Sequence, residues 1–267
     1  MNVPRIIHQT ISNPSKLTSE MHSNIDKMKS NNSNWEYRLY SGKDRVSYIE
    51  RNFPSSMLTF YRNIDERYGA ARADLFRYLV IKKEGGVYLD IKSTFVKPLD
   101  EIIKPHDRFV TSNWPQSLDG TDISDWGFHK NLTTREFPNC FIISDPEHPV
   151  VTACLEKVLE NIADYRPLRD GVGRRGVLNL TGPIPYTESI LPYLETDLVR
   201  VSTFQQLGFR YTFYPYKENL HFELSDNSHY TKLLIPIIHN SRFKTLLIKF
   251  YFGFRKLATK FVSKLAF

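Results

Sequence analysis

The chain has 267 residues, of which 41% are hydrophobic and 24% charged, and this composition predicts a folded globular protein with a sizeable core. No run approaches the roughly 18 to 20 apolar residues that a membrane-spanning helix needs, which argues against a bilayer-spanning segment. The net charge of +7 lies entirely after residue 241: residues 242–267 hold seven of the 36 Lys and Arg and no acidic residue, and 29 basic residues face 29 acidic ones before them.

Cysteine usage and the first residues indicate the compartment. The two cysteines, Cys140 and Cys154, provide neither a disulfide framework nor the spacing of a metal site, which fits a reducing environment. The opening residues MNVPRIIHQT lack the basic segment and long apolar stretch of a secretory signal peptide. We therefore expect a cytoplasmic location.

Along the chain, strand patterns alternate with helix patterns. Short β-rich runs lie at 3–9, 35–41, 87–90, 108–114 and 139–144, and helical patterns at 18–31, 44–53, 55–64, 69–86 and 148–162. We further expect 177–191 to contain a strand, a turn and a helix that begins near Pro183. The alternation predicts an α/β fold, a mainly parallel sheet flanked by helices. We expect residues 1–241 to form this domain and 242–267 a separate tail.

The block AARADLFRYLVIKKEGGVYLD at 70–90 carries the chemistry of interest. Asp74 and Arg77 are three residues apart on a predicted helix and share one face; for this pair alone, a solvated ion pair is the simpler interpretation. Gly85 and Gly86 are suited to end the helix. Asp90 then closes a short strand, and α/β sheets bind ligands beyond the carboxyl ends of their strands. We therefore expect Asp74, Arg77 and Asp90 to meet around one ligand.

This block resembles the core of the DXD-containing glycosyltransferases of family 32, and PRIIHQT at 4–10 and LTGP at 180–183 resemble flanking motifs of that family. The resemblance implies a GT-A fold and transfer of a hexose from a UDP- or GDP-linked donor, with retention of the anomeric configuration. It implies that Asp74 accepts hydrogen bonds from sugar hydroxyls. It also implies that Arg77 holds sugar or phosphate and that Asp90 faces the ribose and a Mn²⁺ or Mg²⁺ ion.

Further donor-side positions follow from the same resemblance. They are His8, Gln9, Arg72, Tyr88, Gly182 and Pro183. His8 and Gln9 end the first predicted strand near the nucleotide, and Tyr88 lies near the donor. Gly182 and Pro183 suit a tight turn into a helix N-terminus, which would face the diphosphate or the acceptor.

Lys92 departs from the family pattern, because the second aspartate of the DXD motif stands at this position in the family. A protonated lysine cannot ligate a metal. One account is that Lys92 contacts the diphosphate as a point charge, with a weak or absent metal requirement. Another is that it points away and that Asp90, His239 and the phosphates hold the metal. The third is a protein that binds a nucleotide sugar or glycan without catalysis. The family's tryptophan after the HQ motif is also replaced here by Ile11, which leaves the donor base open.

A polar loop near residues 119–126 offers residues for the acceptor side. Asp122 and Asp125 are carboxylates there, and Trp114 and Trp126 have rings that suit stacking on sugars. A solvated loop is the simpler interpretation for each of these residues.

Residues 242–267 read as a basic amphipathic helix. Apolar residues recur at 247, 250, 251, 254, 257, 258, 261 and 265, and Lys256, Lys260 and Lys264 fall on the opposite side. Such a helix fits an anionic membrane surface; a terminal helix packed on the domain is the alternative. No nucleic-acid module is present.

Taken as a whole, the sequence predicts a glycosyltransferase that is peripheral on the inner face of the membrane. It would build surface polysaccharide or lipopolysaccharide on a glycan or lipid-linked acceptor. A membrane-associated scaffold is the remaining alternative.

Overall fold

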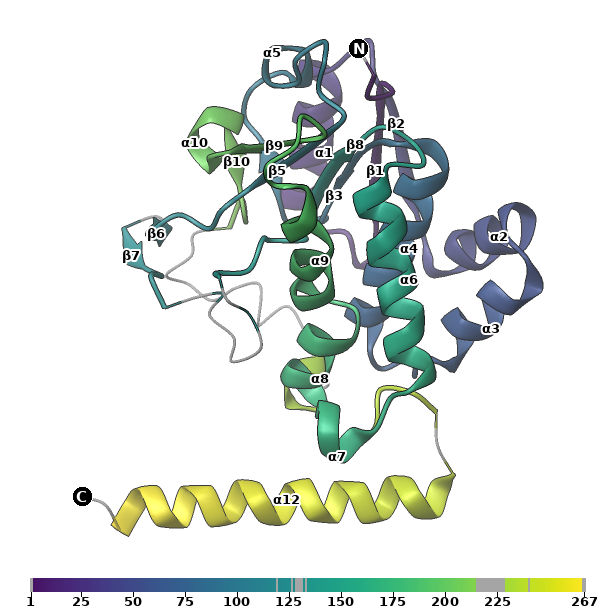
Figure 1. Ribbon diagram of the computed structural model, residues 1–267, viewed down its shortest axis with the longest axis vertical. Coiled ribbons are helices and arrows are strands. Elements are labelled where there is room, and N and C mark those ends of the chain that lie inside the picture. The colour runs from purple at the N-terminus through teal and green to yellow at the C-terminus, as the bar shows by residue number, and fades with distance from the viewer. Residues whose placement is uncertain are drawn as a thin grey trace.

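The structure, a computed structural model, describes residues 2–118, 120–125, 127, 132, 134–214, 229–239 and 241–265, with the backbone alone for residues 242 and 256–265. Figure 1 shows a central sheet covered by helices, with one long helix lying across the far end of the molecule. The predicted α/β class is therefore confirmed.

The main sheet has six strands in the order β2-β1-β3-β8-β5-β9. Their bounds are β1 (Ile6–Thr10), β2 (Glu36–Tyr40), β3 (Gly86–Leu89), β5 (Phe109–Ser112), β8 (Phe141–Ser144) and β9 (Val199–Ser202). All strands run in one direction except β8, which is antiparallel to both β3 and β5. The sheet is therefore mainly parallel, as predicted, with one reversed strand at its centre.

Two short strand pairs lie outside the main sheet. Strand β4 (Thr94–Phe95) pairs antiparallel with β10 (Phe209–Arg210), and β6 (Ser117–Leu118) pairs antiparallel with β7 (Thr121–Asp122). The β4–β10 pair brings the chain around residue 210 next to the loop that follows β3. Two segments that are more than a hundred residues apart in the sequence thus become neighbours.

Helices connect the strands and cover the sheet (Figure 1). The α-helices are α1 (Ser19–Asn31), α2 (Gly42–Asn52), α3 (Ser55–Asn63), α4 (Gly69–Glu84), α5 (Leu99–Ile102), α6 (Pro149–Ala163), α7 (Pro167–Asp170), α8 (Gly173–Leu180), α9 (Pro183–Ile190), α10 (Phe204–Leu207) and α12 (Arg242–Leu265). Single 3₁₀ turns span η1 (Pro14–Lys16), η2 (Leu191–Tyr193) and η4 (Tyr230–Lys232). Local chemistry fixes several helix starts: Ser41 caps α2 in a reciprocal capping box with Asp44.

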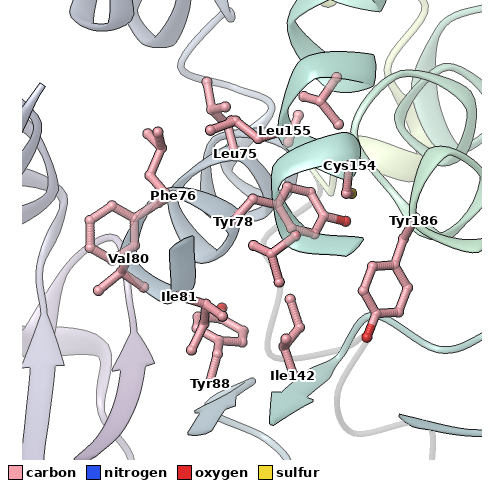
Figure 2. Close-up of a cluster of buried hydrophobic side chains, with 14 of the residues drawn as sticks. Leu75, Phe76, Tyr78, Val80, Ile81, Tyr88, Ile142, Cys154, Leu155 and Tyr186 are labelled. Atoms are coloured by element: carbon pink, nitrogen blue, oxygen red, sulfur yellow. The ribbon is translucent and has the colours of Figure 1, made fainter. Parts of the chain in front are cut away.

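Side chains from the two faces of the sheet fill two hydrophobic clusters. On strands β3 and β8, Tyr88 and Ile142 belong to one cluster, whereas Val87, Leu89 and Ile143 belong to the other. This is the two-residue alternation of a strand buried on both faces. Figure 2 shows the first cluster, where side chains of α4 pack with those of α6 and of the sheet. Helix α4 is buried almost all round, so its polar side chains Asp74 and Arg77 lie in the interior.

The strand predicted within 177–191 is wrong. Helix α8 continues to Leu180, and a turn at Thr181 and Gly182 leads into α9, whose start at Pro183 was predicted correctly. The buried residues of α8 recur at positions 173, 176, 177 and 180, which is helical spacing. Two of these positions are glycines, so the apolar pattern was weak in the sequence.

Helix α12 lies beyond α7 and α8, away from the sheet (Figure 1). Several of its large apolar side chains are exposed, among them Phe250 at 69% and Phe254 at 73%. None of the helices described is long and apolar enough to cross a bilayer. The division of the chain at residue 241 stays a prediction.

Candidate active site

Asp74 is a buried carboxylate surrounded by hydrogen-bond donors. Its Oδ2 accepts from the Thr181 hydroxyl at 2.9 Å, and its Oδ1 accepts from the Asn139 amide at 3.3 Å and lies 3.2 Å from Arg77 Nη2. Burial raises the pKa of Asp74 to about 6, and the Asp90 carboxylate adds to this rise. Arg77, Thr181 and Asn139 favour the ionised form and limit the shift.

Arg77 joins the two acidic residues of the site. Its Nη2 lies 2.8 Å from Asp90 Oδ1 as well as 3.2 Å from Asp74 Oδ1, and its Nη1 donates to the Asn139 carbonyl. The guanidinium also covers the Tyr88 ring, 4.6 Å from the centroid. Burial opposes the charge, but Asp90, Tyr88 and Asp74 outweigh it and raise the pKa of Arg77 further. The arginine therefore stays charged and fixes the spacing of the two carboxylates.

Asp90 follows the last residue of β3 and is held by its backbone. Its N–H donates to the Cys140 carbonyl at 2.8 Å, and its carbonyl accepts from the Gln9 side chain at 3.2 Å. Its side chain remains 24% exposed. The carboxylate can therefore reach a ligand while Arg77 and the Tyr88 hydroxyl orient it.

These three side chains line one pocket of about 490 Å³, within the size range of small-molecule sites. The pocket also contains Lys92, Gly182 and Pro183 from the predicted set. Its other polar or aromatic lining residues are Trp114, Glu136, Asn139, Arg174, Tyr211, His229, Tyr230 and Thr231. The structure thus assembles most of the predicted positions around a single cavity.

The Lys92 ammonium points into this pocket next to an aromatic side chain. Its Nζ donates to the Tyr211 hydroxyl at 2.7 Å. Burial opposes the charge, but the Tyr211 phenol and the Asp90 carboxylate outweigh it and raise the pKa of Lys92. The residue that breaks the DXD pattern is therefore a charged group of the pocket.

Four predicted donor residues do not line the pocket, and His8 and Arg72 are two of them. His8 is fully buried, with Nε2 donating to the Gly85 carbonyl and Nδ1 accepting from the Tyr40 hydroxyl, both at 3.1 Å. Burial lowers the pKa of His8 to about 4, so it is neutral. Arg72 donates to the Ile64 carbonyl from two nitrogens. Both side chains are therefore engaged by the protein itself and lie outside the pocket lining, and their place near the donor stays a prediction.

Gln9 and Tyr88 contact Asp90 or Arg77 without lining the pocket. Gln9 donates to the Asp90 carbonyl and accepts from the Tyr37 hydroxyl at 2.7 Å. Tyr88 is buried under Arg77, and its hydroxyl donates to Asp90 Oδ1 at 3.2 Å. Each contacts Asp90 or Arg77 and is absent from the pocket lining, and their place near the donor stays a prediction.

His239 belongs to a different cavity. It lies 3.8 Å from Asp65, and both residues line a pocket of about 310 Å³ together with Arg67 and the start of α12. Its backbone N–H donates to the Asn63 carbonyl, which keeps this segment beside the loop between α3 and α4. The predicted metal pair of Asp90 and His239 is therefore not assembled. Within the described part of the chain, no group of three His, Cys, Asp or Glu residues is arranged to hold a metal ion.

The residues considered for the acceptor side separate into two groups. Asp122 and Asp125 are exposed on their loop and do not line the pocket. Trp114 does line it, with its indole N–H donating to Glu136 at 3.3 Å. Trp126 lies outside the described residues.

Sequence reasoning missed three important side chains. Thr181, the donor to Asp74, lies inside the LTGP motif and was within reach of the motif argument. Asn139 begins a predicted strand, and nothing in the sequence links it to α4. Tyr211 reaches the pocket through the β4–β10 pair, and the sequence around it gives no signal of this long-range pairing.

Comparisons with known proteins show a likeness to glycosyltransferases. Residues 18–110 match the family model of the glycosyltransferase sugar-binding region containing a DXD motif. The chain is 25% identical over 182 residues to the initiation-specific alpha-1,6-mannosyltransferase of Candida albicans, covering 63% of this chain and 43% of that protein. It is 32% identical over 104 residues to inositol phosphoceramide mannosyltransferase 3 of Schizosaccharomyces pombe, covering 38% and 27%. The chain thus spans less than half the length of these curated relatives.

A solved structure supports the fold. The PaToxG glycosyltransferase superposes over 72% of this chain and 69% of its own, with a TM-score of 0.51 and 16% sequence identity. This likeness confirms the predicted GT-A fold. Over residues 18–110, the chain is therefore similar to the glycosyltransferases that carry a sugar-binding region with a DXD motif.

Proposed function

We propose that the chain is a glycosyltransferase that moves a hexose from a nucleotide sugar to a glycan or lipid-linked acceptor. The observation that carries this proposal is the convergence of Asp74, Arg77 and Asp90 on one pocket of about 490 Å³. All three residues belong to the sugar-binding region that the family model matches.

The chemistry of the pocket suits a sugar bound to a phosphate. Asp74 and Asp90 supply carboxylate oxygens that accept hydrogen bonds from hydroxyl groups, whereas Arg77 and Lys92 supply positive charge. Arg77 orients both carboxylates before a ligand arrives, and such preorganisation reduces the entropy lost on binding. In this proposal Asp74 binds the sugar, Asp90 faces the ribose, and Gly182 and Pro183 shape the wall of the pocket at the start of α9.

The donor is a UDP- or GDP-hexose. Two relatives are named as mannosyltransferases, so donors that carry mannose are the first to test. We further propose transfer with retention of the anomeric configuration, in the synthesis of surface polysaccharide or lipopolysaccharide. The anomeric configuration of the product, read by NMR, tests the stereochemical part.

The proposal is tested by replacing Asp74 in the full-length chain. The assay measures release of UDP or GDP from a panel of nucleotide sugars, with and without glycan acceptors. Asp74→Asn should lower the release at least about tenfold, because it removes a charged acceptor from the sugar site. Asp26→Asn, on the exposed side of α1, is the control and should retain wild-type release.

Two results would contradict the proposal. Wild-type release by Asp74→Asn would reject the role of Asp74. Binding of a nucleotide sugar by the wild type without release from any donor would favour the alternative of a non-catalytic binding protein.

We also propose that α12 binds an anionic membrane surface and keeps the enzyme peripheral to the membrane. Two observations support this: the exposed apolar side chains of α12 and the absence of any acidic residue from 242–267. A lipid-linked acceptor would then lie in the same plane as the enzyme.

A further inference from the structure

Lys92 is held in the pocket by a segment that is distant in the sequence. Besides the bond from its Nζ to the Tyr211 hydroxyl, its carbonyl accepts from the Phe213 N–H at 3.0 Å. The neighbouring Ser93 hydroxyl donates to the Tyr211 carbonyl at 2.7 Å. The loop after β3 and the chain after β10 are thus fastened together. The ammonium therefore has a defined position, two residues beyond Asp90.

In the described part of the chain, the Lys92 ammonium is not paired directly with a carboxylate. Arg77 contacts both Asp74 and Asp90, but across the residues that the structure describes Lys92 forms no ion pair with an Asp or Glu, and its hydrogen-bond acceptor is the Tyr211 hydroxyl. The Asp90 carboxylate acts on Lys92 but is itself ion-paired with Arg77, so the ammonium keeps positive charge available for an anionic ligand. The site therefore favours an anion next to Asp90.

The same residues do not fit a divalent metal. Asp90 Oδ1 already accepts from Arg77 at 2.8 Å and from the Tyr88 hydroxyl at 3.2 Å. The nearby Lys92 ammonium would repel a second cation. Glu136, another carboxylate of the pocket, accepts from the Trp114 indole, and no described group of three His, Cys, Asp or Glu residues is arranged around an ion.

We propose that Lys92, positioned by Tyr211, binds the diphosphate of the nucleotide-sugar donor and takes the place of a divalent cation. This inference rests on the proposed function, because it assigns the charge that faces the leaving group. The exposed Arg174 of α8 lines the same pocket and adds a second positive group that a diphosphate can reach.

The transfer step balances without a metal. The bond between the anomeric carbon and the β-phosphate oxygen breaks, and its electron pair stays on the departing nucleoside diphosphate. The acceptor hydroxyl oxygen forms the new bond to the anomeric carbon and loses its proton to water. The Lys92 ammonium keeps its own protons and donates hydrogen bonds to the phosphate oxygens as their negative charge increases.

The test measures binding of UDP and GDP to the full-length chain by calorimetry, once in EDTA and once with Mn²⁺. The wild type should bind its preferred diphosphate about equally tightly in the two buffers. Lys92→Met keeps the length of the side chain but removes the charge, and should weaken binding about tenfold or more in EDTA. Lys92→Arg should retain most of the affinity, and Lys92→Asp should weaken binding in EDTA and regain it with Mn²⁺.

Two controls separate charge from misfolding. Lys97→Met replaces an exposed lysine outside this pocket and should bind like the wild type. Uridine and guanosine lack phosphates, so Lys92→Met should bind the preferred nucleoside as the wild type does.

The proposal is overturned if wild-type binding disappears in EDTA and returns with Mn²⁺, or if Lys92→Met binds the diphosphate as tightly as the wild type. Failure of the wild type to bind UDP and GDP in both buffers would instead reject the proposed function itself, and this inference with it.

Discussion

At Asp74, burial and ionisation oppose each other. The pKa of this carboxyl rises from 3.8 to about 6 on folding, so the folded protein binds the proton more tightly than the unfolded chain does. The resulting stability is fully present below about pH 4 and is lost as the pH rises through about 6. The same ionisation creates the carboxylate that we propose as the hydrogen-bond acceptor for the donor sugar. Ionisation of Asp74 therefore lowers the stability of the fold while it supplies this acceptor.

Two variants measure how the ionisation of Asp74 changes the free energy of unfolding. The free energy of unfolding of Asp74→Asn, relative to that of the wild type, should increase by about 2 to 3 kcal/mol between pH 4 and pH 7, because the variant has no buried carboxyl to ionise. Urea denaturation at several pH values gives the difference. Asp26→Asn controls for loss of a surface carboxylate. A difference that stays constant or decreases with pH would contradict the assignment.

Single residues were predictable where the signal was local. Asp74 and Arg77 share a face because they are three residues apart on a helix. Asp90 follows a short strand, and the two glycines before that strand indicate where it begins. The contacts of His8 were not predictable, because its ring nitrogens bond to Tyr40 and Gly85, which are distant in the sequence. His239 failed because its position depends on a contact with the chain near Asn63, which no local pattern encodes.

At the scale of elements, the turn from α4 into β3 determines where Asp90 lies. Gly85 and Gly86 have φ angles of +66° and +89°, a region that favours glycine. A Cβ on Gly86 would lie 2.5 Å from the carbonyl oxygen of Ile6 on the neighbouring strand β1. The second glycine is therefore required both by backbone conformation and by the close approach of two strands.

Two glycine variants separate these requirements. Gly120 has a φ of +77°, and a Cβ at this position would point into open space, so Gly120→Ala should lose only about 1 to 2 kcal/mol of unfolding free energy from backbone conformation. Gly86→Ala should lose at least about 2 kcal/mol more, because β1 and β3 must move apart. Thermal and urea denaturation of both variants give the comparison. Equal losses would mean that the approach of the strands is not tight.

At the scale of the whole molecule, the order of motifs predicted the fold, but the pocket needed the structure. One part of the cavity lining comes from residues 70–90, where a helix, a turn and a strand follow one another directly in the sequence. Tyr211, His229 and Tyr230 also line the cavity; the β4–β10 pair brings Tyr211 there, and the other two lie at the 3₁₀ turn η4. Their sequence is not distinctive, so the anchor of Lys92 was not foreseen.

The charge distribution leads to a prediction for the whole chain. Residues up to 241 carry no net charge, and the excess of seven basic residues lies in the segment of α12. The full-length chain should therefore sediment with phosphatidylglycerol vesicles about tenfold more efficiently than with phosphatidylcholine vesicles at low ionic strength. High salt should remove most of this preference, because it screens exposed charges.

Apolar contact is the second part of that binding, and it can be removed without changing the charge. A double replacement of Phe250→Ser and Phe254→Ser should release the protein from phosphatidylglycerol vesicles, since both side chains are exposed on α12 and would enter the lipid interface. Val96→Ser, an exposed apolar site on the main domain, should bind like the wild type. If the double variant still binds, charge alone holds the helix to the surface. If the wild type binds neither lipid, the proposed membrane association is wrong.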